Sequence, residues 1–463
     1  MKKKAKESKI KDNRIYYERI TTVFMIALST VFLLFPGFNG YEGILQSKFA
    51  AFCVVCGGYI VVMAVFSVEG AVIGALKLSP PGTWLKNTTW VQRLMLIYLT
   101  ITWISALASE YFPTTVIGAT RFEGALTVSI YVLVFLLVSL FGRVTEKVVW
   151  AFAGAAVIFS VISLVQFMGY NPLGLFPEGY NYYDAYKAYS GQYLGTVGNV
   201  DLVAAFLCIL IPVMLGAIVR SRNKKKYILL VPLILSVFVL VKMSVMAGFA
   251  GVGLGLVLSL PVLVELDKKK RLKIAVGAGG LIIAGLLIVF CVDFGGGFLH
   301  ELHMVLHGKA DSGFGSGRLY IWNCVLDAVP SNLILGTGPD TMAFANFEPF
   351  SRYDANLGGT IYASIDIAHN DFLNIIYHQG IFAFAAYAAG LVSAAVKWIK
   401  YGSSDAAAAV AGTAVLCYCI QAFFGFSVCI TAPFFWAALG LLEKRTTGIM
   451  RGDIGNEKKT VLS

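Results

Sequence analysis

Residues 200–219 have the sequence VDLVAAFLCILIPVMLGAIV, in which Asp201 is the one charged side chain. A helix of about 20 mainly apolar residues is long enough to cross the hydrocarbon core of a bilayer. The whole chain of 463 residues is 58% hydrophobic and 14% charged, with a mean hydropathy of +0.75. Soluble proteins are about 45–50% apolar and about 25% charged. The sequence therefore predicts an integral membrane protein.

Apolar runs of this kind recur along the chain, so the predicted fold is an all-α, polytopic transmembrane bundle of about 12 spans. Residues 227–264 could instead form one long helix, which would leave eleven spans. The last run is short, and Pro433 could kink it. The predicted spans are 20–36, 49–75, 92–109, 124–141, 148–168, 200–219, 227–242, 245–264, 274–292, 372–396, 406–425 and 428–442.

Lysine and arginine cluster between the apolar runs, and their distribution predicts the orientation of the chain. With a cytoplasmic N-terminus and twelve spans, 30 of the 37 basic residues lie on the cytoplasmic side. Both termini are therefore expected in the cytoplasm. The net charge of +11 lies in these short clusters, so no nucleic-acid partner is expected. The basic start resembles a signal peptide, but Phe35-Pro36-Gly37 replaces a small-residue cleavage site, and we expect an uncleaved first span.

Between residues 293 and 371 the apolar runs stop. This polar segment is predicted to form one large extracytoplasmic loop between spans 9 and 10 and to carry the chemistry. The chain is thus divided into a cytoplasmic basic N-terminus (1–19), spans 1–9 (20–292), the polar segment (293–371), spans 10–12 (372–442) and a cytoplasmic tail (443–463).

Within the polar segment, residues 298–307 are predicted to form a short helix with His300, His303 and His307 on one face. Three such histidines could bind a metal ion. An amphipathic helix lying at the membrane surface is the favoured alternative. No metal or other cofactor is expected.

Several short motifs occur in a fixed order on the predicted outer side, and together they resemble the O-antigen ligase family. The resemblance covers about residues 110–442. That family also contains lipid-linked glycan polymerases and protein O-oligosaccharyltransferases. The motifs are Arg121-x-Glu123-Gly124, Gly195-Thr196-x-Gly198-Asn199, Arg318-x3-Trp322, Leu335-Gly336-Thr337-Gly338-Pro339, His369-Asn370-Asp371 and Ala432-Pro433-Phe434-Phe435-Trp436.

The resemblance implies a GT-C-like membrane glycosyltransferase that acts without a metal. Such an enzyme takes a glycan from an undecaprenyl diphosphate carrier at the outer face of the bacterial cytoplasmic membrane. It passes the glycan to a hydroxyl of a glycan, lipid or protein acceptor. Membrane lipid is a further expected partner.

By family position, His369 is the candidate general base and Arg318 the candidate diphosphate ligand. Histidine titrates near neutral pH, and guanidinium offers forked donors to phosphate. Asn370 and Asp371 are expected to orient His369 or bind sugar. The remaining predicted substrate contacts are Arg121 and Arg352, as anion ligands, and Glu123, Trp322, Gly338 and Asn199. Tyrosines of the loop 169–201 could stack on sugar rings or form an interfacial belt.

One departure from the family pattern lies where the eighth span begins. Relatives carry a Ser-Arg-Gly-type motif there, and this chain has Val245 at the arginine position. Lys242 could compensate, as a point charge rather than a fork.

Three other functions stay open. A polymerase that joins lipid-linked repeat units would need the same chemistry. A transporter would concentrate polar residues near the bilayer midplane, which is nearly free of charge here, so an enzyme acting at the outer face is favoured. A catalytically inactive scaffold of envelope assembly would explain the missing arginine.

Overall fold

The computed structural model of the chain describes residues 2–72, 87–183, 191–354 and 359–453, which are mostly helical. Its first helices are α1 (Lys2–Ala27), η1 (Leu28–Phe32), α2 (Ile44–Phe52), η2 (Cys53–Gly57), α3 (Gly58–Val72), α5 (Trp90–Ala108), α6 (Thr114–Ile117), α7 (Ala125–Phe141), α8 (Glu146–Phe167), α9 (Val200–Arg220), η3 (Lys224–Leu229), α10 (Leu230–Met243), α11 (Met246–Leu263) and α12 (Lys268–Cys291). The later helices are α13 (Gly297–Leu306), α14 (Arg318–Ala328), η4 (Val329–Asn332), η5 (Met342–Phe344), α15 (Asp371–Tyr401), η6 (Gly402–Ser404), α16 (Ala406–Phe423) and α17 (Ala432–Arg451). Two antiparallel hairpins complete the set: β1 (Tyr193–Leu194) with β2 (Gly198–Asn199), and β3 (Phe350–Asp354) with β4 (Gly359–Ala363).

Nine helices among the described residues are long and apolar enough to cross a membrane, and each coincides with a predicted span. The chain is therefore a membrane protein. The other three predicted spans fall on α1 with η1, on α7, which is apolar but has only 17 residues, and on α17. Which helices cross the bilayer stays a prediction.

The predicted break between residues 242 and 245 is confirmed at the level of helices, because α10 and α11 are distinct. Ser244 between them has a φ of 54°, a left-handed conformation that ends α10. Pro433 lies in the first turn of α17. A proline at that position starts a helix, because its missing N–H would have no partner there, so the predicted kink at Pro433 is wrong.

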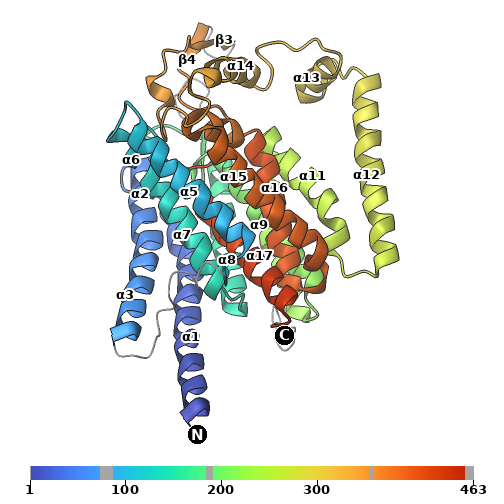
Figure 1. Cartoon of the computed structure of the whole chain (residues 1–463). Coiled ribbons are helices and arrows are strands. Elements are labelled where there is room, and N and C mark those ends of the chain that lie inside the picture. Colours follow the sequence, from blue (N-terminus) through green and yellow to red (C-terminus); the bar gives the residue numbers. More distant parts are fainter. Residues whose placement is uncertain (1, 73–86, 184–190, 355–358, 454–463) are drawn as a thin grey trace.

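The helices form one bundle with α9 and α16 at its centre. α9 packs against α16, α11 and α10, while α15 packs against α5 and α17 against α7. In contrast, α12 stands at the side of the bundle and buries only Ala278 and Val289 (Figure 1).

The polar segment gathers at one end of the bundle, which we call the segment end. There α14 and the β3–β4 hairpin lie together above α15, α13 lies beside the upper end of α12, and α6 of the loop 109–123 lies at the opposite edge (Figure 1). α1 begins and α17 ends toward the opposite end, which we call the terminal end. This arrangement agrees with the predicted topology, and the extracytoplasmic placement of the segment end stays a prediction.

A break divides α15 near its first third. Gly380 has a φ of 83°, and a Cβ at this position would lie 2.1 Å from the carbonyl oxygen of Ile334. A turn of the polar segment fills the break: Thr337 N–H donates to the carbonyl of Tyr377 (3.0 Å), and Gly338 N–H donates to that of His378 (2.8 Å). The freed carbonyls are therefore satisfied by the turn, which joins the polar segment rigidly to α15.

Candidate active site

Arg318 begins α14 and reaches toward the bundle. Its Nε donates to the carbonyl of Phe424 (2.9 Å), and Nη1 donates to that of Gly315 (2.8 Å). Its Nη2 lies 3.5 Å from Oδ2 of Asp201, in the first turn of α9. Trp322, one turn further along α14, donates from Nε1 to the carbonyl of Ala368 (2.9 Å). Because Arg318 and Trp322 are one turn apart on α14, the hydrogen bond of Trp322 fixes the Arg318 guanidinium relative to the peptide that precedes His369.

His369 is held in a left-handed conformation with a φ of 49°. A residue other than glycine adopts this conformation only when its surroundings enforce it. Here Asn374 accepts the N–H of Ala368 (2.8 Å), and Asn370 caps α15 by accepting the N–H groups of Phe372 and Leu373. The imidazole Nδ1 is buried and has no hydrogen-bond partner among the described residues. The fold therefore fixes this ring and leaves one nitrogen unpaired.

Arg121 supplies a second guanidinium. It forms a bidentate pair with Asp366, with Nη2 at 2.8 Å from Oδ2 and 3.0 Å from Oδ1. Oδ2 of Asp340 accepts the backbone N–H of Arg121 (2.9 Å), which fixes the loop that carries it. The centroid of the Phe426 ring lies 4.9 Å from Cζ of Arg121 and 5.2 Å from the centroid of the His369 ring. Phe426 is thus the wall shared by the base candidate and this arginine.

The charges around His369 act on its proton affinity. Burial, together with the positive charges of Arg318 and Arg121, lowers the pKa of His369 from 6.5 to about 4, although Asp201 and Asp366 act in the opposite direction. The imidazole is therefore neutral at physiological pH and able to accept a proton.

Two carboxylates hold the loop that presents Phe426. Oε1 of Glu123 accepts from the hydroxyl of Tyr131 (2.8 Å) and from the N–H of Cys429 (2.7 Å). The Asp371 carboxylate accepts the N–H and the hydroxyl of Ser427, at 3.2 and 3.0 Å. Burial raises the pKa of Glu123 well above its usual range.

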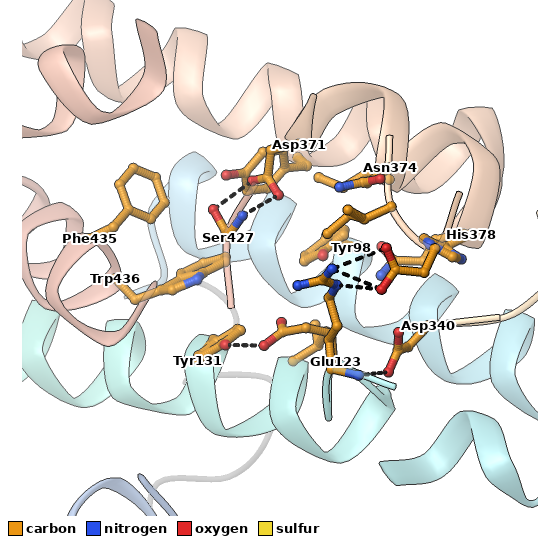
Figure 2. A pocket seen from close by; sticks show the side chains of 17 residues that line it. Tyr98, Glu123, Tyr131, Asp340, Asp371, Asn374, His378, Ser427, Phe435 and Trp436 are labelled. Atoms are coloured by element: carbon orange, nitrogen blue, oxygen red, sulfur yellow. Dashed lines mark hydrogen bonds and ion pairs between the residues drawn. The ribbon is translucent and has the colours of Figure 1, made fainter. Parts of the chain in front are cut away.

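These carboxylates line a cavity of about 80 Å³, together with Arg121 and Asp366 (Figure 2). Aromatic side chains, including Trp436, form another part of its wall.

Part of this constellation, including Arg318 and His369, lies in a stretch that matches a known family model. Residues 232–388 match the family model of the O-antigen ligases. The predicted resemblance is thereby confirmed for the part of the chain that holds Arg318 and His369. The family indicates a membrane function of the O-antigen ligase or polymerase type. No curated protein matches the chain.

The fold brings most of the predicted residues together, and their roles in binding or catalysis stay predictions. Gly338 lies in the joint with α15, where a Cβ would meet the Ser109 hydroxyl at 2.5 Å, so the close approach of side chains accounts for the glycine. Asn199 caps α9 by accepting the N–H of Asp201 (2.8 Å). Arg352 lies on β3, and its side chain is outside the described residues.

Lys242 does not fill the place of the missing arginine in this structure. It is exposed, and its Nζ lies 6.0 Å from the ring centroid of Phe238 on the same helix. The second guanidinium beside the histidine comes from Arg121 instead.

The tyrosine-rich loop divides into packed and exposed side chains. Tyr182 is buried against Phe167, with ring centroids 4.7 Å apart, and Tyr193 stacks on Tyr41 at 5.4 Å. Tyr170 and Tyr183 are exposed. Tyr186 and Tyr189 lie outside the described residues.

The histidines of α13 do not converge on one point. His300 Nδ1 lies 2.5 Å from Oδ1 of Asp293, whereas His303 Nδ1 bonds the carbonyl of Val289 at 2.8 Å. His307 bonds the carbonyl of His303 at 2.8 Å. These contacts join α13 to the end of α12.

Asp201, Asp340, Asp366 and Phe426 are not among the site residues predicted from the sequence. Asp201 had a usable signal, because it is the one charge in the apolar run 200–219. The role of Phe426 had none, since 33 phenylalanines occur in the chain and only tertiary contacts distinguish this one.

Proposed function

We propose that this protein is a membrane glycosyltransferase of the O-antigen ligase type. It transfers a glycan from an undecaprenyl diphosphate carrier to an acceptor hydroxyl, at the outer face of the bacterial cytoplasmic membrane. The observation that carries the proposal is the unpaired, buried Nδ1 of His369, next to Arg318 and Arg121. The match to the O-antigen ligase family supports the same reaction class.

The acceptor hydroxyl gives its proton to His369 as its oxygen forms a bond to the anomeric carbon of the donor glycan. The bond from that carbon to the diphosphate oxygen breaks, and its electron pair stays on the diphosphate. Arg318 and Arg121 stabilise the added negative charge with charge-assisted hydrogen bonds. The imidazolium then releases its proton to solvent, and undecaprenyl diphosphate leaves.

The proposed proton transfer agrees with the electrostatics of the free site. A base must be unprotonated before the reaction, and His369 is neutral at pH 7. Binding of the anionic diphosphate adds negative charge beside the two arginines, which raises the proton affinity of the imidazole toward the useful range.

The test compares the glycans of cells that lack the protein with cells complemented by wild type, His369→Ala or His303→Ala. His303 on α13 bonds the carbonyl of Val289 and serves as the matched histidine control. Full-length lipid-linked polymer should accumulate in the deletion strain and be cleared by wild type and His303→Ala. His369→Ala should not clear it, because loss of a general base costs about 10²–10⁴-fold in rate.

The other outcomes discriminate among the alternatives. Accumulation of single lipid-linked repeat units would assign a polymerase. Clearance by His369→Ala at normal abundance would reject His369 as the base. No change in either glycan pool would favour a transporter or a scaffold.

A further inference from the structure

Each arginine of the candidate site already holds a carboxylate. Arg121 binds both oxygens of Asp366, and Nη2 of Arg318 lies 3.5 Å from Asp201. The four side chains are between 19% and 30% exposed, so a ligand can reach them. Carboxylate and phosphate oxygens use the same guanidinium donors. A diphosphate that binds these arginines must therefore displace the aspartates or share the guanidinium donors with them.

The two aspartates belong to different elements, and the charge of each acts on His369. Asp366 precedes His369 by three residues in the polar segment. Asp201 begins α9, where Asn199 accepts its N–H, and its carbonyl accepts from Gln421 Nε2 at 3.4 Å. The carboxylates can thus lose contact with the arginines while their backbones keep them beside the imidazole.

The charges that act on His369 are these two arginine–aspartate pairs. The arginines oppose a positive imidazolium, and the aspartates favour it. In the proposed transfer, His369 becomes positive at the moment when the arginines are engaged by the diphosphate. A counter-charge is needed beside it, and the described residues place Asp201 and Asp366 there.

We propose that Asp201 and Asp366 are positioning residues with two successive tasks, an inference that rests on the proposed transferase function. Before the donor binds, they hold Arg318 and Arg121 in place. When the diphosphate takes over the guanidinium donors, the released carboxylates stabilise the imidazolium form of His369.

The test uses the full chain in lipid nanodiscs and the variant Asp201→Asn. Asp201→Asn keeps the shape of the side chain but removes a competitor for Arg318. The Kd for undecaprenyl diphosphate should therefore fall about threefold to tenfold, as expected for loss of a partly exposed ion pair. In transfer assays, kcat should fall about tenfold or more, because the imidazolium loses a counter-charge. The acid limb of the kcat profile should move to lower pH, and Asp201→Glu should restore kcat.

Asp327→Asn is the matched control, because Asp327 is an exposed aspartate of α14 outside the pairs around His369. It should leave Kd, kcat and the pH profile unchanged. If Asp201→Asn does not fold, Asp366→Asn carries the same expected signs. Tighter product binding together with slower turnover is not the result of a merely structural defect, which would weaken both.

Weaker undecaprenyl diphosphate binding in Asp201→Asn, or an unmoved acid limb with kcat preserved, would overturn the inference. Failure of the wild type to transfer any glycan would reject the proposed function and the imidazolium role with it. The binding measurement needs no turnover and would still decide whether the aspartate competes with the diphosphate.

Discussion

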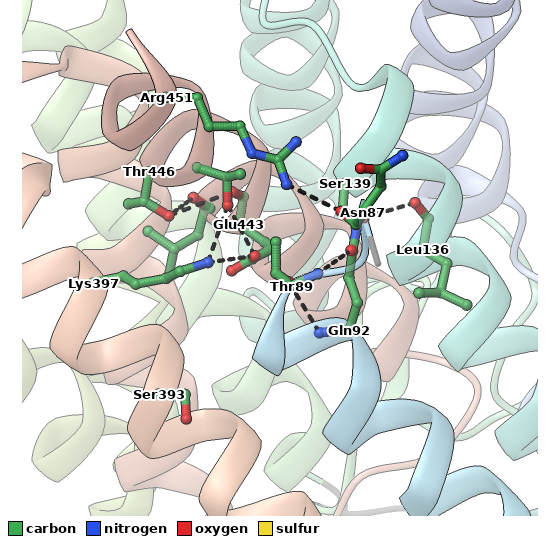
Figure 3. Close-up of polar contacts among 12 residues, drawn as sticks. Asn87, Thr89, Gln92, Leu136, Ser139, Ser393, Lys397, Glu443, Thr446 and Arg451 are labelled. Carbon is green, nitrogen blue, oxygen red and sulfur yellow. Dashed lines mark hydrogen bonds and ion pairs between the residues drawn. The ribbon is translucent and has the colours of Figure 1, made fainter. Parts of the chain in front are cut away.

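The two ends of the bundle both contain buried or half-buried charges, but the charges are arranged differently. At the terminal end, Lys397 Nζ lies 2.5 Å from Glu443 and also donates to Thr447 (Figure 3). The side chains of Lys397 and Glu443 are only 15% and 1% exposed. At the segment end, the Arg318–Asp201 pair is longer, at 3.5 Å, and about one-fifth exposed.

The difference indicates at which end of the bundle a charged side chain can exchange its ion-pair partner for a ligand. Glu443 has one oxygen without a partner among the described residues, but its other oxygen accepts from both Lys397 and Thr447. These side chains are buried and their ion-pair distance is short, as expected of an ion pair that fixes α15 against α17. The ion pairs at the segment end are longer and more exposed to solvent. Nδ1 of His369 has no hydrogen-bond partner there among the described residues, as expected of a site that must accept an anionic ligand.

The largest expected effect comes from breaking the pair at the terminal end. Lys397→Ala leaves the buried carboxylate of Glu443 without its counter-charge, so the unfolding free energy should fall by about 3–5 kcal/mol. Denaturation in mixed micelles measures this loss. Transfer activity per folded molecule should stay at the wild-type level.

Lys400→Ala is the control for Lys397→Ala, because Lys400 is an exposed lysine in the last turn of the same helix. Its cost should stay within about 0.5 kcal/mol. Equal losses for the two variants would show that the Lys397–Glu443 pair does not stabilise the fold.

The next effect sharpens the role of the segment end. Arg318→Lys keeps the charge but loses the fork, and hydrogen bonds to charged groups contribute about 1.5–3 kcal/mol. The kcat/KM for donor, per folded molecule, should therefore fall about 10- to 100-fold. Arg451→Lys at the terminal end, where Arg451 donates to the carbonyl of Asn87, should leave kcat/KM unchanged. If both variants behave alike, Arg318 is not a diphosphate ligand.

The smallest expected effect is the pH dependence of stability. Because the pKa of His369 in the fold is about 4, below its ordinary value of 6.5, the unfolded chain binds a proton that the folded chain excludes between these values. The wild type should therefore lose more stability than His369→Gln as the pH falls from 6.5 toward 4, and the two should run parallel above pH 6.5. Thermal unfolding across this range measures the difference. Parallel curves throughout would mean that His369 is not held neutral by the fold.

The helices were predictable from the sequence because hydropathy is a local property. Each of the nine long apolar helices coincides with a predicted run, and the break between α10 and α11 was placed correctly. The kink at Pro433 was wrong because a proline has opposite meanings in the first turn and in the interior of a helix. Hydropathy alone does not locate the first turn.

The site was predictable only where a motif carries it. His369 and Arg318 were predicted from the family pattern, and the family match over residues 232–388 covers both, while their roles stay predictions. The partner of Arg121 was not found, because Asp366 lies 245 residues away and no local rule joins the two. Gly338 was predicted as a ligand contact because glycine permits any close approach, and here the close approach is that of the Ser109 and Thr115 side chains.

The break in α15 has a consequence for protein engineering. The turn 333–338 and the first third of α15 are joined by backbone hydrogen bonds, whereas the rest of α15 packs with the bundle. A chimera that exchanges the polar segment between relatives should therefore place its downstream junction at Gly380 rather than at Asp371. The transplanted segment would then keep its own hydrogen bonds to the first third of α15. The specificity that it carries could be exchanged without redesigning the other helices of the bundle.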